Sequence, residues 1–266
     1  MENFHYIGEP LFSLIMVMHK PIVNRMHEAR VTLNTMRETG INTHFLAWSQ
    51  RSGVQTAFDW IRKGAIGKLQ EIHNWSNRPV WPQWMSKPDE NPEVPEGFDW
   101  DMWLGPVPPR PYHPNYTHAV FMGWYDFGNG SIGDMGHYSL WPLFMTFGID
   151  APPEGAEVCG TTTSTIENHV SRKLHNDVSF PYSCIIRYNY PEQKELPPFK
   201  LFLNAGGMKP STPDEPDEED KELPAEGIMF MGNIGKILGS FHCDSPRIIP
   251  EQRMIKKDGR CRCMKM

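Results

Sequence analysis

A glycine-rich motif near the middle of the chain constrains its organisation more than any other feature. Residues 128–133 have the pattern G-x-G-x-x-G. This pattern binds a dinucleotide when a buried strand enters it, a helix follows, and an acidic residue comes about 20 positions later. The preceding residues 122–127 hold a glycine, a charge and bulky aromatics, and Asp150 lies in a proline-bearing turn. We therefore interpret the glycines as the opening of a helix that carries chemistry, and place any nucleotide domain upstream.

The first 65 residues alternate between strand and helix patterns. Strands are predicted over residues 11–18 and 41–48. Apolar residues at three- and four-residue steps predict a helix over residues 25–39, capped by Asn24 and ended by Gly40. A second helix is predicted with Ser52 as its cap and Gly64 at its end. Its apolar face consists of Val54, Ala57, Phe58 and Ile61. This order predicts half of a doubly wound sheet without its opening strands.

The chain changes character after Gly67. A strand is predicted over residues 69–75, followed by a proline-rich coil over residues 78–115 that we expect to pack through its tryptophans. Strands dominate the remainder, and a hairpin turn is predicted at residues 233–235. The predicted later strands are residues 157–163, 183–190, 199–203, 228–231 and 236–241. We expect the acidic run 209–226 to be a solvated loop and residues 255–266 to be a disordered tail.

Composition excludes several classes of function. The 266 residues carry a net charge of −6 and a pI of about 6.0, which gives no basic field for nucleic acid. No apolar run reaches the roughly 18 residues of a membrane span, and no basic segment precedes the first apolar run as in a signal peptide. The five cysteines have neither disulfide-framework nor zinc-site spacing. We predict a cytoplasmic protein with no metal site and no nucleic-acid or membrane partner.

Aromatic residues are concentrated in one part of the chain. All nine tryptophans lie between Trp48 and Trp141. Large rings bury area in a core, and they also stack on the apolar faces of sugars. We expect most of them to be core or loop anchors. The candidates for lining a substrate pocket are Trp81, Tyr112, Trp124 and Trp141.

Two groups of residues can carry chemistry. Lys20 follows a predicted strand, where open α/β sheets bind ligands, and Pro21 would hold the backbone that directs it. In the predicted helix, His137 and Tyr138 come three and four positions after Asp134 and share its face. An acceptor, an imidazole and a phenol on one face suit proton transfer. A surface lysine and a hydrogen-bonded core histidine are the ordinary alternatives.

Several stretches together resemble one family, the Gfo/Idh/MocA oxidoreductases. The resemblance runs from about residue 15 to residue 254. Residues 19–21 (H-K-P) are similar to the family's E-K-P motif, whose lysine is catalytic, although His19 replaces the glutamate. Residues 64–68 resemble the turn that enters the second domain, and residues 130–141 resemble the substrate-site helix. Further similar stretches are residues 75–82, 95–106, 206–210 and 232–238, of which the first two indicate a carbohydrate-associated branch.

The resemblance implies an α/β fold with two parts. A partial Rossmann-like strand–helix–strand–helix segment (residues 1–66) would precede an α+β domain with a large open, mostly antiparallel sheet (residues 67–254). It implies hydride transfer between NAD or NADP and a hydroxyl of a sugar or polyol. Lys20, His137 and Tyr138 would handle the proton, Asp134 would orient, and Lys20 with Pro21 would contact the cofactor. The open sheet would join copies of the chain into a homo-oligomer.

The departures from the family pattern leave three alternatives open. The expected upstream phosphate loop is missing, so the chain is similar to a member shortened at both ends. The family's helix places histidine four positions after the aspartate, whereas Tyr138 stands there and His137 comes one earlier. The family favours an enzyme, either an oxidoreductase or a glycoside-cleaving relative that uses NAD transiently. The missing loop favours a non-catalytic sugar-binding or dimerisation domain.

Overall fold

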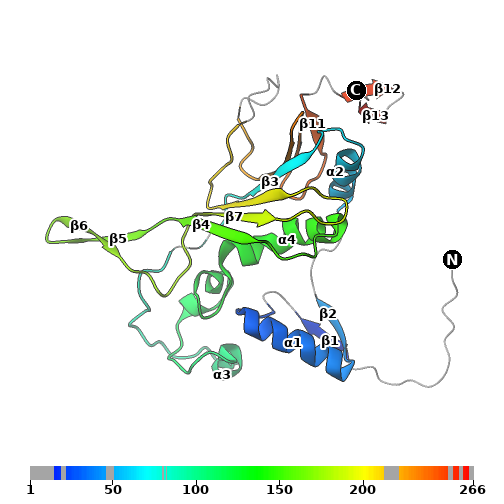
Figure 1. The fold of residues 1–266 in the computed structure, drawn as a ribbon. Helices are drawn as coiled ribbons and strands as arrows, with labels where there is room; N and C mark the ends of the chain where they lie inside the picture. Colours follow the sequence, from blue (N-terminus) through cyan, green and yellow to red (C-terminus); the bar gives the residue numbers. More distant parts are fainter. Residues whose placement is uncertain are drawn as a thin grey trace, which may run out of the picture. The chain divides into compact units, whose positions relative to one another are not determined.

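The chain is divided into two compact units. The computed structural model describes residues 15–18, 22–45, 51–79, 81, 83–212, 222–250, 254–257 and 260–263. One unit spans residues 1–47 and the other spans residues 48–266 (Figure 1). In the part of the chain that is described, no helix is long and apolar enough to cross a membrane.

The first unit has the predicted strand–helix–strand order. The two strands pair in parallel. Its elements are β1 (Ile15–Met18), α1 (Met26–Thr39) and β2 (Asn42–Phe45). The Glu28 carboxylate accepts the backbone N–H groups of Asn24 and Arg25, so it holds the helix start in place of the expected Asn24 side chain. Gly40 ends the helix as predicted, with φ of 65° and its N–H donated to the Met36 carbonyl.

The second unit is built on a seven-stranded sheet. Its strand order is β11-β10-β9-β3-β8-β7-β4, with β3 and β8 parallel and all other neighbours antiparallel. The large, mostly antiparallel sheet of the prediction is therefore confirmed. The strands are β3 (Leu69–Trp75), β4 (Gly155–Gly160), β7 (Cys184–Tyr190), β8 (Phe199–Ala205), β9 (Gly227–Gly232), β10 (Lys236–Gly239) and β11 (Arg247–Ile249).

Two helices share a hydrophobic core with this sheet. These are α2 (Ser52–Arg62) and α4 (Gly130–Phe147), which contact each other. The predicted apolar face of α2 is buried, and the rings of Phe58 and Phe147 lie 4.6 Å apart between the helices. The N-cap is Arg51, so the expectation that Ser52 caps the helix was wrong. Because α2 packs in the second unit, the compact units divide before it, whereas the domain limit at residue 66 stays a prediction.

Alternation along the strands places one set of side chains in this core. Ile72, Leu201 and Phe230 come from neighbouring strands and are fully buried. Each such side chain stabilises the fold by about 1.5–3 kcal/mol. The next residues along β3 and β8, His73 and Phe202, lie on the opposite face of the sheet and stack with ring centroids 4.4 Å apart. The helices therefore cover one face, and the other carries a mixture of aromatic and polar groups.

The proline-rich coil packs, as its tryptophans predicted. It holds α3 (Trp100–Leu104) and reaches η1 (Pro114–Tyr116), and η2 (Ala119–Gly123) follows. The Asp99 carboxylate accepts the N–H of Met102 at 2.9 Å and caps α3. A second core forms here from Trp100, Leu104, Tyr112, Tyr116, Trp124 and Phe127. This cluster folds the long coil into a layer beside α4 (Figure 1).

Two hairpins were not predicted. The strands β5 (Thr163–Glu167) and β6 (Val170–Leu174) pair antiparallel and extend from the sheet as an arm (Figure 1). Most of their side chains are exposed, so no alternation of apolar residues marked them. The strands β12 (Met254–Lys257) and β13 (Arg260–Cys263) form a second hairpin in the segment expected to be disordered.

Candidate functional site

The predicted helix face exists, and it is part of α4. The helix begins at Gly130, within the glycine pattern that was expected to open it. Asp134, His137 and Tyr138 are all half-buried. The rings of His137 and Tyr138 lie 3.8 Å apart. His137 Nδ1 donates to the backbone carbonyl of Asp134 at 2.9 Å. Because that bond holds the Nδ1 proton, the acceptor nitrogen of the neutral ring is Nε2.

Buried hydrogen bonds fix α4 to the end of β3. The Ser139 hydroxyl donates to the Asn74 side-chain oxygen at 2.8 Å, and the Asn74 amide donates to the Gly227 carbonyl at 3.0 Å. The Ser131 hydroxyl donates to the Arg78 carbonyl at 3.1 Å. The Ser139 bond ties the helix turn after His137 to the sheet, and the Ser131 bond ties the first turn of the helix to the coil after β3. The site residues therefore stand on a rigid element.

The glycines of the G-x-G-x-x-G pattern serve packing within the chain. A Cβ on Gly128 would lie 2.4 Å from the backbone of Met122, and one on Gly130 would lie 2.8 Å from the ring of Phe180. A Cβ on Gly133 would meet the side chain of Asn129. Before the motif come the helical turn η2, which ends at Gly123, and a turn over residues 125–127, and no strand enters the glycines. This segment does not fit a dinucleotide pyrophosphate, because its own neighbours occupy the space that the glycines leave.

A histidine that the sequence analysis missed completes the site. The ring of His242 lies 6.1 Å from the ring of Tyr138. His242 belongs to a tight turn in which the Cys243 N–H donates to the Ser240 carbonyl at 2.8 Å and the Asp244 N–H donates to the Ser240 hydroxyl at 2.9 Å. Cys243 and Ser245 have φ angles of 60° and 48°. Left-handed backbone at non-glycine residues is costly, and it clusters at functional sites.

The first turn of α2 supports this turn directly. A Cβ on Gly53 would lie 1.7 Å from the carbonyl oxygen of Cys243, so only glycine permits the approach. Cys243 itself is fully buried, and burial raises the pKa of its thiol to about 12. Because the thiolate is the nucleophile, a cysteine whose thiol stays protonated serves packing and does not act as a nucleophile. In the sequence, Gly53 could have indicated a close contact at this position, but not the residue that makes it.

The charges around His242 favour its neutral form. Burial lowers the pKa of His242 from its ordinary value of 6.5, and the positive charge of Arg51 lowers it further. The carboxylates of Asp244 and Glu226 raise the pKa and only partly compensate. A neutral imidazole can accept a proton near pH 7. We name Arg51, Asp134, His137, Tyr138 and His242 the α4 site.

The four aromatic candidates for substrate contact separate into two groups. Trp81, Tyr112 and Trp124 are only 5, 8 and 1% exposed. Trp124 stacks on Trp84 at 5.1 Å and donates its indole N–H to the Asn115 carbonyl, which is the behaviour of a core residue. Trp141 is 42% exposed on α4, one turn beyond Tyr138. The structure gives the first three a packing role, and a substrate role for any of the four stays a prediction.

The remaining expected site residues lie elsewhere or outside the described part. Lys20 and Pro21 fall outside the described residues. Within the described residues, no group of three or more His, Cys, Asp or Glu side chains could hold a metal ion.

Part of the chain is similar to a known protein family. Residues 42–166 match the model of the C-terminal alpha/beta domain of the Gfo/Idh/MocA oxidoreductase family. Over this segment the chain is similar to the Gfo/Idh/MocA oxidoreductases. The matched residues include α2, the proline-rich coil and α4, so the α4 site lies largely within the Gfo/Idh/MocA segment. No curated protein matches this sequence.

Three solved structures illustrate the similarity in three dimensions. The WlbA dehydrogenase from Bordetella pertussis, in complex with NADH and UDP-GlcNAcA, is 12% identical over 86% of this chain and 52% of its own, with a TM-score of 0.46. A super-repressor mutant of Gal80p from Saccharomyces cerevisiae is 13% identical over 88% and 52%, with a TM-score of 0.47. An Agrobacterium radiobacter oxidoreductase, in complex with NAD+, L-tartaric acid and magnesium, is 12% identical over 84% and 48%, with a TM-score of 0.39. The chain spans about half the length of these proteins.

Proposed function

We propose that this chain is part of a Gfo/Idh/MocA oxidoreductase that acts on a hydroxyl of a sugar or polyol with NAD or NADP. The observation that carries the proposal is the approach of His242 to Tyr138, 6.1 Å between rings, beside His137 on α4. Two imidazoles and a phenol at one half-buried place suit the movement of a hydroxyl proton. The match of residues 42–166 to the family model supports the same chemistry.

Each residue of the α4 site would have a distinct task. His242, whose pKa is lowered by burial and by Arg51, would accept the hydroxyl proton. The Tyr138 phenol would donate a hydrogen bond to the substrate oxygen and hold it beside His242. His137, with Nε2 as its acceptor nitrogen, would hold a second hydroxyl. Asp134 would orient the substrate, and the exposed ring of Trp141 would contact the sugar face.

The nucleotide would supply the hydride acceptor. The residues at 128–133 do not fit it, so we propose that the N-terminal segment, residues 1–66, contacts it through Lys20 and Pro21. The strand–helix–strand order of β1, α1 and β2, with its parallel pairing, supports this assignment because such units build dinucleotide-binding sheets. Residues 67–254 would then form the substrate domain.

The proposal is tested by nucleotide binding and turnover of the purified chain. We expect NAD(H) or NADP(H) to bind in calorimetry, and reduction at 340 nm with at least one member of a panel of aldoses and polyols. His242→Gln should lower kcat by roughly 10²-fold or more, because it removes a proton acceptor. Tyr138→Phe should lower it by about tenfold through one lost hydrogen bond. The matched control is His169→Gln, an exposed histidine on the arm.

Three results would contradict the proposal. A folded chain that binds neither nucleotide favours a non-catalytic domain. Release of an aglycone from glycosides without net NADH favours the glycoside-cleaving relative. Turnover that is equally unaffected by His242→Gln and His169→Gln removes the α4 site from the chemistry. Lys20→Ala, compared with Lys63→Ala, tests the nucleotide contact separately.

We also propose that the chain forms a homo-oligomer through the sheet face opposite α2 and α4. On that face the stacked rings of His73 and Phe202 lie at the centre of the strand order, and the Glu157–Arg187 ion pair lies beside them. A mixed apolar and charged face can pair with its own copy about a two-fold axis. Sedimentation should show a dimer, and Phe202→Glu should shift it to the monomer. A wild-type monomer at high concentration would refute this proposal.

A further inference from the structure

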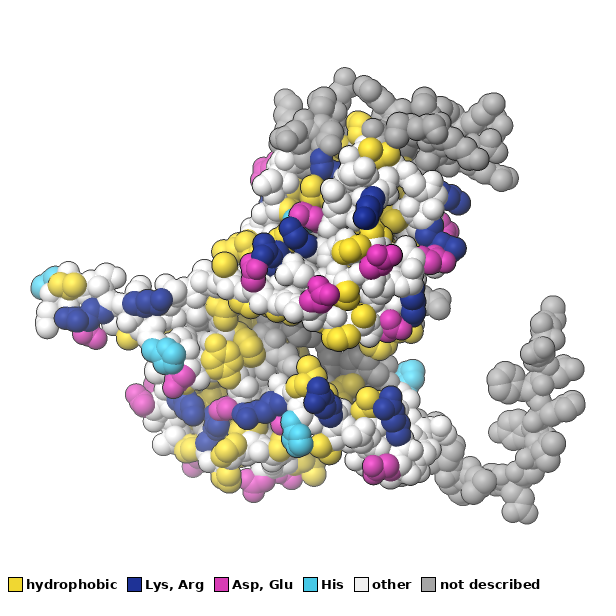
Figure 2. Space-filling view, in the orientation of Figure 1, with side chains coloured by type: hydrophobic (Ala, Val, Ile, Leu, Met, Phe, Trp, Pro, Cys, Tyr) yellow, Lys and Arg dark blue, Asp and Glu magenta, His cyan; other side chains and the backbone are white. Residues whose placement is uncertain are grey.

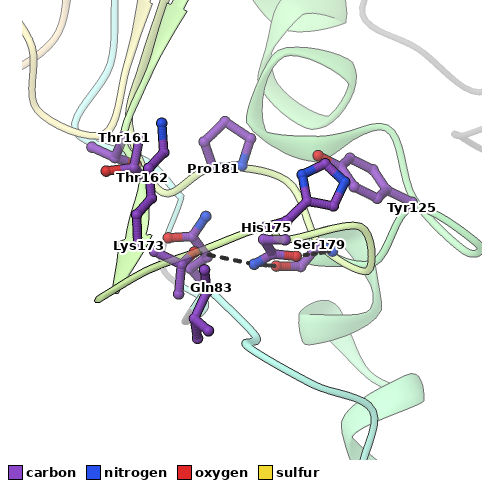
Figure 3. Close-up of a pocket in the computed structure, with 11 residues that line it drawn as sticks. Gln83, Tyr125, Thr161, Thr162, Lys173, His175, Ser179 and Pro181 are labelled. Atoms are coloured by element: carbon purple, nitrogen blue, oxygen red, sulfur yellow. Dashed lines mark hydrogen bonds between the residues drawn. The ribbon is translucent and has the colours of Figure 1, made fainter. Parts of the chain in front are cut away.

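A second hollow lies at the base of the β5–β6 arm, and none of its lining residues belongs to the α4 site. Its volume is about 410 Å³. Its walls come from the coil after β3, from the segment before α4 and from the two ends of the arm (Figure 3). We name it the arm pocket. The residues that can meet a ligand are Gln83, Tyr125, Thr161, Thr162, Lys173 and His175.

The floor of the arm pocket is a closed hydrogen-bond network. The Asn176 amide donates to the Trp84 carbonyl at 2.7 Å and to the hydroxyls of Ser179 and Thr163 at 3.2 and 3.3 Å. Its oxygen accepts the N–H groups of Val178 and Ser179 at 3.1 and 3.0 Å. The Ser179 hydroxyl also donates to the Trp84 carbonyl. The donors and acceptors of the floor are hydrogen-bonded to one another, so the floor is preorganised. The polar groups of the wall residues can therefore bind a ligand.

The arm pocket is positively charged. Lys173 and His175 line it, and no Asp or Glu does. Over the described part of the chain, neither side chain has an ion pair or hydrogen bond. The adjacent Arg172, by contrast, pairs with Glu167 at 3.1 Å. Basic side chains are visible along the arm (Figure 2). An unpaired cation in a hollow without acids favours an anionic ligand.

The uncharged wall residues suit a sugar ring. Tyr125 is 38% exposed, and Phe180 holds its ring edge-on at 4.5 Å. A fixed aromatic ring can stack on the apolar face of a sugar. The Gln83 carboxamide and the Thr162 hydroxyl can each donate to and accept from sugar hydroxyls. The Thr161 oxygen accepts the Ser183 N–H at 3.3 Å, so its own proton can be donated.

We propose that the arm pocket binds an anionic sugar, a pyranose that carries a carboxylate or a phosphate group. Lys173 and His175 hold the anionic group, Tyr125 stacks on the ring, and Gln83 and Thr162 bind its hydroxyls. The site requires no nucleotide and no residue of the α4 site. The arm-pocket proposal therefore goes beyond the proposed function, and it can be tested independently of that function.

The test is calorimetry on the full chain with four probes. These are D-glucuronate, D-glucose 6-phosphate, D-glucose and inorganic phosphate. We expect at least one of the two anionic sugars to bind at least tenfold more tightly than glucose or phosphate. Lys173→Gln should weaken its binding by about tenfold, the size of one charge-assisted hydrogen bond. Arg172→Gln is the matched control, because it removes the same charge from the neighbouring residue and should change the affinity less than twofold.

Several outcomes would overturn the proposal. Glucose binding as tightly as both anionic sugars would remove the role of charge. Phosphate binding as tightly as both anionic sugars would leave a simple anion site. Anionic-sugar binding that is unchanged in Lys173→Gln but lost in His242→Gln would belong to the α4 site. Absence of binding by all four probes to a folded chain would reject the pocket altogether.

Discussion

The Ser139 hydroxyl on α4 donates a buried hydrogen bond of 2.8 Å to the side-chain oxygen of Asn74 on β3. Ser139 is 2% exposed and Asn74 is 6% exposed, so water cannot replace either partner. The Asn74 amide in turn donates to the Gly227 carbonyl of β9. One residue therefore joins the helix of the α4 site to two strands of the sheet.

Ser139→Ala should lower the free energy of unfolding by about 1–3 kcal/mol, because it leaves the Asn74 oxygen buried without its donor. Urea unfolding followed by tryptophan fluorescence measures it, since all nine tryptophans lie in the second unit. Ser171→Ala, an exposed serine on the arm, is the control and should change stability by less than about 0.5 kcal/mol. Equal changes in the unfolding free energy for the two substitutions would show that the hydrogen bond between Ser139 and Asn74 does not stabilise the fold.

Gly53→Ala should destabilise the second unit strongly. The new Cβ would lie 1.7 Å from the Cys243 carbonyl oxygen, and backbone must move to admit it. Overpacking of this kind costs about 1–3 kcal/mol or more. Gly136→Ala is the control, because its Cβ would meet a flexible methyl of Leu140 at 3.2 Å and Ile132 at an ordinary contact distance of 3.7 Å, and it should cost less than about 1 kcal/mol. Thermal unfolding compares the two, and an unchanged midpoint for Gly53→Ala would be inconsistent with this close approach.

Arg110→Ala should cost more than removal of an exposed arginine. Arg110 donates to Asp126 at 2.6 Å and lies over the rings of Tyr116 and Phe127, with only 14% of its side chain exposed. We expect a loss of roughly 2 kcal/mol, less than for a fully buried pair because Asp126 is 30% exposed.

The control for Arg110 is Arg62→Ala. Arg62 pairs with Glu195 at 2.7 Å, but both side chains are more than half exposed. Such a pair contributes less than about 1 kcal/mol. Denaturant titrations give the unfolding free energies of Arg110→Ala and Arg62→Ala for comparison. Similar losses of unfolding free energy for Arg110→Ala and Arg62→Ala would show that the second core does not depend on the Arg110 cation.

The unfolding free energy should fall when the pH drops below about 6.5. Burial lowers the pKa of both His73 and His242 in the folded chain from their ordinary value of 6.5. The unfolded chain therefore binds more protons below that value, and protonation favours unfolding. Well above pH 6.5 both rings are neutral in either state, and the full stability is present.

Urea unfolding at pH 7.5 and 5.5 measures this dependence. The double substitution of His73 and His242 by Gln should reduce the difference between the two values. Glu71→Gln provides a second check, because the Glu71 carboxylate contacts His73 Nε2 at 2.9 Å and raises its pKa. NMR titration should find the pKa of His73 lower still in that variant. An unchanged pH dependence in the double variant would assign it to other groups.

Local patterns in the sequence predicted the elements that local physics controls. The buried face of α2 follows from the spacing of its apolar residues, and Gly40 marks the end of α1. Asp134, His137 and Tyr138 share a helix face because helix geometry is the same wherever the helix lies. The arm escaped prediction because its side chains are mostly exposed, so β5 and β6 bury no alternating apolar pattern.

Only the tertiary structure decided which distant residues meet. His242 reaches Tyr138 because Gly53 admits the Cys243 carbonyl, and no spacing along the chain encodes that contact. The sequence does not distinguish an aromatic residue that packs in a core from one that binds a ligand. Only the structure showed that Trp124 is buried and Trp141 is exposed. The sequence by itself determined the helices α1, α2 and α4, most strands and the family likeness through short-range periodicity and motif spacing. Packing across the sheet decided the α4 site and the arm pocket, because side chains far apart in the chain are brought together only by the complete fold.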